Sequence, residues 1–280
     1  MIDLASSALG SRRGLAKADH RIALVTGAGS GIGRAVAALF AEQGWTVYAG
    51  ILSGQTAPPG TMALSLDVTD EAQIADAVSR VVAEQGAIDL LVNNAAINPA
   101  GSIEGLGASA FRAILGVNVL GAIAMTVAVL PHMRARRGGM IMNIGSGMSR
   151  AIIPFSAGYA TSKYALEGFS RALWHEATPL GISVKYIMLG SHNTGFGVSE
   201  PDLANDPPAY HARLLKMAAF ANQTLTRAAG PKQAARGIMR ITQRHDRQLV
   251  CTVGFDARLA RWIGALPFGL TGRLLARLFR

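Results

Sequence analysis

The sequence has 280 residues, of which 50% are hydrophobic and 16% are charged. This length predicts one large domain, and the apolar content excludes a disordered or fibrous chain. The formal net charge of +10 is uneven, because residues 211–280 carry 13 basic and two acidic side chains. Aromatic residues do not alternate with these arginines, so we expect no nucleic-acid partner and interpret them as a solvated helix face. An anionic surface such as lipid headgroups is the alternative.

Short apolar runs alternate with longer amphipathic stretches over residues 21–255. This alternation predicts βαβ units in a single α/β domain, with a doubly wound parallel sheet of about seven strands and helices on both faces. Residues 1–20 lack the apolar run of a signal peptide and are interpreted as an N-terminal extension. The single cysteine, Cys251, cannot form an internal disulfide, which favours a reducing cytoplasm. The expected strands are 22–26, 46–49, 63–66, 90–93, 140–144, 184–188 and 249–252.

A glycine-rich turn, TGAGSGIG over residues 26–33, directly follows the first expected strand and precedes a helix. Glycine permits a sharp turn, brings backbone N–H groups close to a pyrophosphate and lets the helix pack on the sheet. The turn therefore predicts a dinucleotide site, and a glycine turn without a ligand is the alternative.

The uncharged stretch over residues 113–130 is long enough for a membrane span. Asn118 lies near its middle, Gly116 and Gly121 interrupt it, and no second such run accompanies it. We therefore interpret it as a helix of a soluble α/β protein that is buried on several sides, between the sheet and a partner subunit.

Tyr159 and Lys163 stand four residues apart at the start of an expected helix, so they share one face. An ammonium beside a phenol favours the phenolate and lowers the pKa of the tyrosine from about 10. The pair is therefore a candidate proton donor and acceptor, although a tyrosine and a lysine at this spacing are also common on helix surfaces.

Taken in chain order, these motifs resemble those of the short-chain dehydrogenase/reductase family over roughly residues 20–255. The turn at 26–33 resembles the family's TGxxxGxG, residues 93–96 its NNAG, and Thr194 the threonine of its PGxxxT. The resemblance implies a Rossmann-type fold and a catalytic set of Asn118, Ser146, Tyr159 and Lys163. It also implies cofactor contacts from Gly27, Ser30, Gly31, Ile32, Gly33, Asp67, Val68, Asn94, Ala95, Tyr159, Lys163 and Thr194.

The resemblance implies that a nicotinamide and a carbonyl or alcohol exchange hydride beside Tyr159. Tyr159 would transfer the proton, and Lys163 would lower its pKa and hold the nicotinamide ribose. Ser146 would hydrogen-bond the substrate oxygen, and Asn118 would hold a water that connects Lys163 to solvent. A silent nucleotide-binding scaffold is the alternative function, but it would not need this proton-transfer set.

Two residues depart from the family's pattern. Ala96 replaces the last glycine of NNAG, which a negative φ at this position would tolerate. Leu189 replaces the proline before Gly190, so we expect a looser strand end and lid hinge.

The choice between NAD(H) and NADP(H) depends on the end of the second strand. No acid stands at Ile51 to bind a ribose hydroxyl, and no Arg or Lys stands at Ser30, Ile51, Leu52 or Ser53 to bind a 2′-phosphate. A buried 2′-phosphate without a basic partner would cost more free energy than a ribose hydroxyl without an acidic partner. The sequence therefore favours NAD(H) over NADP(H).

Residues 191–225 are rich in Pro and Asn and predict a substrate lobe. A hydrophobic alcohol or ketone of steroid, retinoid or long-chain type is the expected substrate, and a 3-oxoacyl thioester is the alternative. We assign no role to His175 or His192 and expect no metal. The apolar side chains expected around the site are Met148, Ile152, Ile153, Phe155, Leu189 and Phe196.

Residues 256–280 form a basic, amphipathic C-terminal tail. Arg273, Arg277 and Arg280 share one helical face, opposite Leu274, Leu275, Leu278 and Phe279. A helix this short needs a docking surface, which is its own domain, a second subunit or a membrane. We favour its own domain and expect a homodimer or homotetramer.

Overall fold

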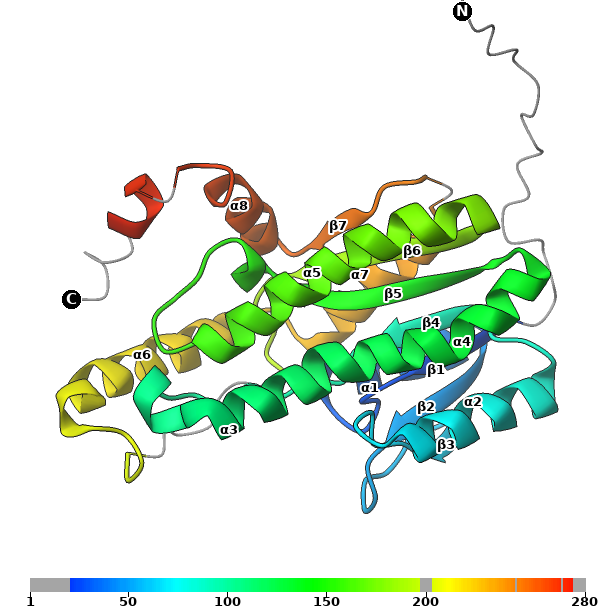
Figure 1. The fold of residues 1–280 in the computed structure, drawn as a ribbon, viewed down its shortest axis with the longest axis horizontal. Coiled ribbons are helices and arrows are strands. Elements are labelled where there is room, and N and C mark those ends of the chain that lie inside the picture. The colour runs from blue at the N-terminus through cyan, green and yellow to red at the C-terminus, as the bar shows by residue number, and fades with distance from the viewer. Residues whose placement is uncertain (1–20, 197–202, 245, 268, 274–280) are drawn as a thin grey trace, which may run out of the picture.

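The computed structural model describes residues 21–196, 203–244, 246–267 and 269–273. A single sheet and the helices packed on it account for these residues (Figure 1). The strands are β1 (Ile22–Val25), β2 (Thr46–Ile51), β3 (Met62–Ser65), β4 (Leu90–Asn93), β5 (Gly139–Ser146), β6 (Ile182–Leu189) and β7 (Val250–Val253). The helices are α1 (Gly31–Glu42), α2 (Glu71–Gln85), α3 (Ile103–Leu115), α4 (Ala122–Arg136), α5 (Ala157–Ala177), α6 (Pro208–Arg227), α7 (Pro231–Thr242) and α8 (Phe255–Ile263), with the short helical segments η1 (Gly116–Gly121), η2 (Gly147–Ser149) and η3 (Thr178–Leu180).

The seven strands lie in the order β3-β2-β1-β4-β5-β6-β7, and every neighbouring pair is parallel. The order reverses direction at β1, which makes β1 a central strand, and all four of its residues are buried. Strands covered on both faces read as continuous apolar runs, as β1 and β4 do. The predicted doubly wound parallel sheet of about seven strands is therefore confirmed.

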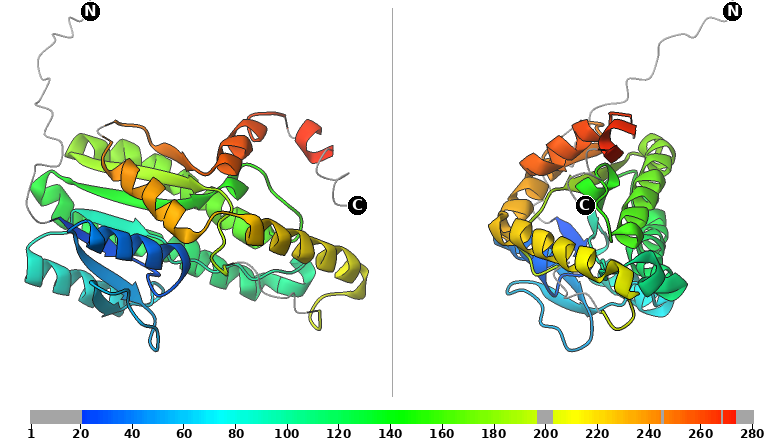
Figure 2. Two further views of the ribbon diagram at one scale, coloured as in Figure 1. Left: turned by 180° about the vertical axis from the view of Figure 1, so that it is seen from behind. Right: turned by 90° about the vertical axis from the view of Figure 1, so that its left-hand side faces the viewer.

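Helices cover both faces of the sheet (Figure 2). On one face, α1 and α7 enclose a core that contains Phe40, Trp45 and Ile238. On the other face, α2, α4 and α5 enclose a second core that contains Met125 and Leu173. These layers leave α3, α6 and α8 beyond the carboxyl ends of the strands, where ligands bind in open parallel sheets.

The apolar stretch at 113–130 is part of one long helical segment, Ile103–Arg136, which changes to a π-helix over η1. By length and composition this segment is the one helix among the described residues that could cross a membrane. One side of it packs on the sheet and on α5, through Ile114, Asn118 and Met125. Leu120 and Val127 on the other side are about 60% exposed in this single chain, so burial of that side by a partner subunit stays a prediction.

Candidate active site

A large cavity of about 1250 Å³ lies along the carboxyl ends of the strands. The glycine turn after β1 lines one end of it, and residues of α6 and α8 line the other. Lys163, between the two ends, is the one Lys or Arg side chain among the described residues that line it. The cavity therefore joins a backbone-rich end to an apolar end, with the predicted proton-transfer residues between them.

The glycine turn has a backbone that other residues adopt only with strain. Gly27 and Gly31 have φ angles of 64° and 53°. Ser30 caps α1 without a side-chain hydrogen bond, so its hydroxyl does not bond to the N–H groups of the first helical turn. These N–H groups and the positive end of the helix dipole are the features that bind a phosphate.

Gly33 has a packing role in this structure. A Cβ there would lie 2.3 Å from the carbonyl oxygen of Gly27 and 2.4 Å from Nδ2 of Asn94. It does not line the cavity, whereas the other predicted cofactor residues do. Gly33 therefore lets α1 approach the turn, and its predicted contact with the cofactor stays a prediction.

Hydrogen bonds from the end of β4 hold the glycine turn in place. The hydroxyl of Thr26 accepts bonds from the backbone N–H groups of Asn94 and Ala95, both at 3.0 Å. The Asn94 side chain donates to the carbonyl oxygens of Thr26 and Gly27 at 3.0 and 3.2 Å. In this structure Asn94 and Ala95 thus position the turn as well as line the cavity.

Asp67 and Val68 follow β3 and line the same end of the cavity. The Asp67 carboxylate accepts hydrogen bonds from the backbone and hydroxyl of Thr69 at 2.9 and 2.7 Å. These bonds hold the carboxylate in one orientation at the cavity wall. Its predicted contact with adenine stays a prediction.

Asn118 lies in the π-helical segment η1, is 1% exposed and does not line the cavity. Its side chain bonds both backbone groups of Ile97, at 2.8 and 3.0 Å, and the Ser162 hydroxyl of α5 at 3.0 Å. Both amide protons are thus used by protein groups, and one acceptor position remains for the predicted water. Asn118 joins the loop after β4 to α5, and π-helical turns of this kind are frequent at functional sites.

Ser146, Tyr159 and Lys163 come together from β5 and α5. The Ser146 hydroxyl accepts a hydrogen bond from the N–H of Met148 at 3.2 Å, which fixes it at the start of η2. The Lys163 ammonium lies 5.3 Å from the centre of the Tyr159 ring and donates to the Ile144 carbonyl oxygen at 2.8 Å. The structure thus brings the three predicted catalytic side chains to the middle of the cavity.

Burial dominates the acidity of this group. It raises the pKa of the Tyr159 phenol to about 12, although a hydrogen bond with Ser146 acts to lower it. Burial also lowers the pKa of the Lys163 ammonium to about 8. The expectation that Lys163 brings the pKa of Tyr159 below 10 is not met in this structure, because the ammonium lies against the ring face and the Ile144 carbonyl.

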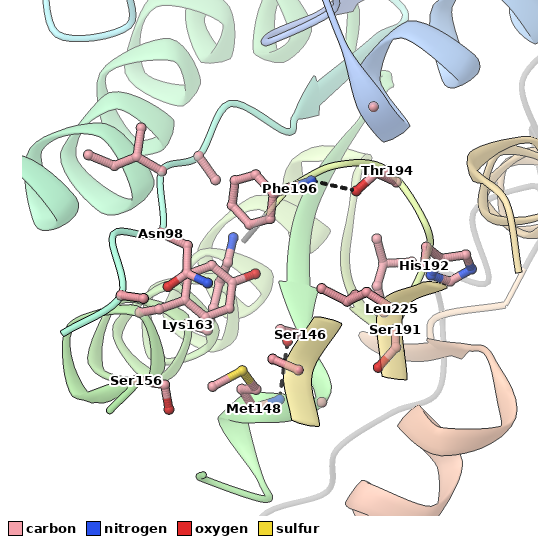
Figure 3. A pocket seen from close by; sticks show the side chains of 18 of the residues that line it. Asn98, Ser146, Met148, Ser156, Lys163, Ser191, His192, Thr194, Phe196 and Leu225 are labelled. Atoms are coloured by element: carbon pink, nitrogen blue, oxygen red, sulfur yellow. Dashed lines mark hydrogen bonds between the residues drawn. The ribbon is translucent and has the colours of Figure 1, made fainter. Parts of the chain in front are cut away.

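The beginning of the lobe after β6 reaches over the glycine turn (Figure 3). Cβ of Thr194 lies 3.4 Å from where a Cβ on Gly31 would be, and its hydroxyl accepts a bond from the N–H of Phe196 at 3.2 Å. The Phe196 ring lies 5.9 Å from that of Tyr159. Thr194 and Phe196 thus connect the two ends of the cavity.

The far end of the cavity is apolar, as expected, but its composition differs from the prediction. Met148, Ile153, Phe155, Leu189 and Phe196 line it, whereas Ile152 is 41% exposed and does not. The sequence does not reveal the contribution of α6 and α8 side chains, because an amphipathic pattern does not show what lies opposite a helix. Those that line the cavity include Leu214, Met217, Leu225, Ala257, Leu259 and Ile263.

A second missed feature is the buried carboxylate of Glu167, four residues after Lys163 on α5. It pairs with Arg150, with Arg171 at 2.7 Å, and with the Ser149 hydroxyl at 3.2 Å. These contacts tie the segment after Ser146 to the helix that carries Tyr159. The four-residue spacing between Glu167 and Arg171 was the available signal.

Phe155 in the loop before α5 is one of two non-glycine residues with positive φ in the described part of the chain, at 60°. Its ring packs edge to face on Tyr210 of α6, with 6.3 Å between ring centres. Strain of this kind gathers at ligand-binding sites, where packing over-determines the backbone. Here it connects the loop before Tyr159 to the helix that covers the cavity.

The structure also tests the two departures from the family's pattern. Ala96 has no positive φ, so the methyl group is tolerated there as expected. Leu189 is buried at the end of β6, and the N–H of Gly190 donates to the Val253 carbonyl at 2.9 Å. The looser hinge expected from the missing proline stays a prediction.

Some expectations concern residues 1–20, 197–202 and 274–280, which lie outside the described residues. They include the N-terminal extension, part of the lobe, and Arg277, Arg280, Leu274, Leu275, Leu278 and Phe279 of the tail. Within the described residues, no group of three or more His, Cys, Asp or Glu side chains could hold a metal ion.

Several known proteins are similar to this chain in sequence or in structure. A family model described as short chain dehydrogenase matches residues 21–202. A 3-ketodihydrosphingosine reductase from Bacteroides thetaiotaomicron is 37% identical over 176 residues, which span 63% of this chain and 65% of that protein. A short-chain dehydrogenase structure from Streptomyces avermitilis has a TM-score of 0.76 at 29% identity, covering 94% of this chain and 96% of the other. A short chain dehydrogenase structure from Burkholderia cenocepacia, in complex with NADP, has a TM-score of 0.71 at 26% identity, covering 92% and 98%.

Proposed function

Because the chain belongs to the short-chain dehydrogenase/reductase family of NAD(P)-dependent oxidoreductases, we propose that it interconverts a hydrophobic alcohol and the corresponding ketone or aldehyde. The observation that carries this proposal is the meeting of Ser146, Tyr159 and Lys163 at the middle of a cavity that is backbone-rich at one end and apolar at the other. A silent scaffold would have no use for a buried lysine against a buried tyrosine, since burying an ammonium costs stability.

The residues at the backbone-rich end fit a nicotinamide dinucleotide. The uncapped start of α1 and the positive-φ glycines suit a pyrophosphate, and Thr194 lies over the same turn. Lys163 would hold ribose hydroxyls, and Asp67 would face the adenine. The nicotinamide supplies or accepts the hydride when it is bound.

In the reducing direction, the carbonyl carbon of the substrate gains the hydride and its oxygen gains the phenol proton of Tyr159. Ser146 donates a hydrogen bond to that oxygen and stabilises the negative charge that develops on it. The charged Lys163 stabilises the phenolate that remains, and this effect offsets the burial that raises the pKa of Tyr159. Oxidation of the alcohol reverses each transfer.

Replacement of the proton donor tests the proposal. Tyr159→Phe should lower turnover by about 10²–10⁴-fold, because positioned proton transfer contributes that much, while cofactor binding is retained. Tyr164→Phe is the matched control, since Tyr164 lies on the same helix and is 43% exposed. Retained turnover in Tyr159→Phe, or equal loss in both variants, would refute the assignment.

For the cofactor, we propose a preference for NAD(H). No Arg or Lys side chain lines the cavity near Ser30, Leu52 and Gln55. Arg34, on the first turn of α1, donates to the Thr56 carbonyl at 2.6 Å. Thermal unfolding with each of NAD, NADH, NADP and NADPH tests this preference, because a ligand at about a hundred times its Kd adds about 2.7 kcal/mol.

A larger shift with NADPH than with NADH would reverse the cofactor assignment. In that case Arg34→Ala should remove the NADPH shift and leave the NADH shift unchanged. No shift with any of the four would favour the scaffold instead.

For the substrate, the apolar side chains at the α6 and α8 end support a steroid, retinoid or long-chain compound. The sphingoid relative named above acts on a molecule of this class by its name. A panel of ketones of increasing chain length should show kcat/KM rising by up to about fourfold per added methylene, which corresponds to about 0.8 kcal/mol. Reaction only with small sugars would exclude a hydrophobic substrate, and strict dependence on a thioester would favour the 3-oxoacyl alternative.

We also propose that two copies associate through the outer sides of α4 and α5, which lie side by side. Leu120, Val127 and Tyr164 give this surface exposed apolar side chains. Sedimentation of Val127→Glu against the unchanged protein tests the homo-oligomer, and an unchanged mass would exclude this surface. The cytoplasm remains our expected location, since Cys251 is a free, buried thiol.

A further inference from the structure

The outer side of α8 is apolar, and no element among the described residues covers it. Only Ala257 and Ala260 of this helix are buried. Phe255 and Trp262 are 76% and 77% exposed, although side chains of this size are normally covered. We define the α8 face by the exposed apolar and basic side chains of α8 and of the segment that follows it, which are Phe255, Arg258, Leu259, Arg261, Trp262, Leu266 and Leu270.

Positive charge is interleaved with these apolar side chains. Among the described residues, neither Arg258 nor Arg261 forms a salt bridge. The single acid of the helix, Asp256, accepts hydrogen bonds from the N–H groups of Ser191 and Ala257, so it is directed toward the protein. The α8 face thus combines exposed aromatic and aliphatic side chains with uncompensated arginines.

This combination identifies the kind of partner. A second copy meeting the same face across a twofold axis would bring the arginines of both copies together, which is unfavourable. The end of this chain would add Arg277 and Arg280, of the same sign. An anionic lipid bilayer satisfies both features, because apolar side chains enter the headgroup boundary while arginines contact the lipid phosphates.

The position of the face relative to the cavity supports the same partner. Leu259 is half exposed and also lines the cavity, and Ile263 lines it from the next turn. On its inner side, α8 packs on η2 directly after Ser146, with a Cβ on Gly147 lying 3.2 Å from that of Ala260. In Figures 1 and 2, α8 lies on the outside of the molecule, at the end where the cavity lies.

We propose that the α8 face docks the protein on an anionic bilayer surface, with the apolar end of the cavity beside the lipid. The binding itself does not depend on catalysis, so it can be measured whether or not the proposed reaction is correct. A hydrophobic compound dissolved in the bilayer would then reach the cavity past Leu259 without crossing water.

Flotation of the full-length protein with vesicles tests this docking. Binding is expected to phosphatidylcholine vesicles that contain phosphatidylglycerol, and to be weaker with phosphatidylcholine alone. The double variant Arg258→Gln/Arg261→Gln should lose about 30-fold in affinity, since each basic residue near an anionic surface contributes about fivefold. Arg112→Gln and Ile103→Gln are matched controls, because both replace exposed residues of α3 near the same end of the molecule.

Tryptophan fluorescence gives a second measurement that needs no loss of binding. The chain has three tryptophans, of which Trp262 is exposed and Trp45 is buried. Anionic vesicles with brominated acyl chains should quench emission of the unchanged protein, and Trp262→Phe should abolish this quenching while flotation is largely retained.

Three outcomes would overturn the proposal. The first is no flotation with anionic vesicles. The second is flotation that the α8 variants and the α3 controls change equally. The third is a change of oligomeric state in the α8 variants without vesicles, which would assign the face to a second copy of this chain.

Discussion

The glycine turn and helix α5 border the same cavity, yet they are built in opposite ways. The turn contributes backbone, since Gly27 and Gly31 hold positive φ and the amide of Asn94 donates to the carbonyls of Thr26 and Gly27. Helix α5 contributes side chains, and it buries Lys163 and Glu167 within one helical turn. A backbone site needs little beyond small residues, whereas a charged side chain must be taken out of water.

This difference determines how each region balances stability against function. Folding the turn costs conformational entropy, because each glycine makes more backbone conformations available to the unfolded chain. Helix α5 costs desolvation, and the lowered pKa of Lys163 is the sign of that cost. Stability that depends on pH should therefore come from α5 and not from the turn.

The largest pH-dependent effect is expected from the removal of the buried ammonium. Burial lowers the pKa of Lys163 from 10.5 to about 8, so the unfolded chain binds the proton more tightly. The penalty of about 3 kcal/mol is fully present below pH 8 and disappears as the pH rises to about 10.5. Lys163→Met removes this penalty and should therefore raise the free energy of unfolding at pH 7. The lost hydrogen bond to Ile144 reduces this gain by about 1 kcal/mol.

Denaturant unfolding of both proteins at pH 7, 8, 9 and 10 measures this effect. The advantage of Lys163→Met should shrink steadily above pH 8, while Lys232→Met, which removes an exposed lysine of α7, serves as the control. The raised pKa of Tyr159 acts above pH 10, where it lowers stability, so the comparison stops there. A constant difference across this range would show that Lys163 is not desolvated.

The second effect concerns the carboxylate on the same helix. Glu167→Ala should lower the free energy of unfolding by about 2–3 kcal/mol, below the 3–5 of a fully buried pair, because Arg171 retains water. Arg80→Ala, in an exposed pair with Glu84, should change it by less than about 0.5 kcal/mol. Equal losses in these two variants would mean that the burial of Glu167 contributes nothing.

The two regions also differ in what could be predicted from the sequence. The order of strands and helices followed from apolar runs, and the turn and the Tyr159–Lys163 pair followed from local spacing. The packing of Gly33 against the turn was not evident, because spacing alone does not distinguish a glycine that lines a site from one that packs beneath it. The predicted direction of the Tyr159 pKa shift was also wrong, since the sequence shows a neighbouring charge but not the burial that outweighs it.

The substrate end was the least predictable part. The amphipathic patterns of α6 and α8 indicate helices but not which of their sides meets the cavity. Leu214 is buried and Trp262 is exposed, although both are large apolar residues on amphipathic helices. Contacts between elements far apart in the chain, such as Phe155 with Tyr210, are set by the tertiary fold and have no local signal.

Two glycines in helices test the backbone half of the comparison. Gly33→Ala places a methyl group against the Gly27 carbonyl, so it should cost about 1–3 kcal/mol and abolish the thermal shift given by the nicotinamide cofactor. Gly168→Ala on α5 has open space around the new methyl group and should instead stabilise the protein by up to about 1 kcal/mol. If the two substitutions changed the free energy of unfolding in opposite directions, steric fit in the turn, and not helix propensity, would determine the stability of the cofactor end. If Gly33→Ala retained the cofactor shift, the close contact would relax without disturbing the phosphate site, and the turn would be less rigid than its hydrogen bonds indicate.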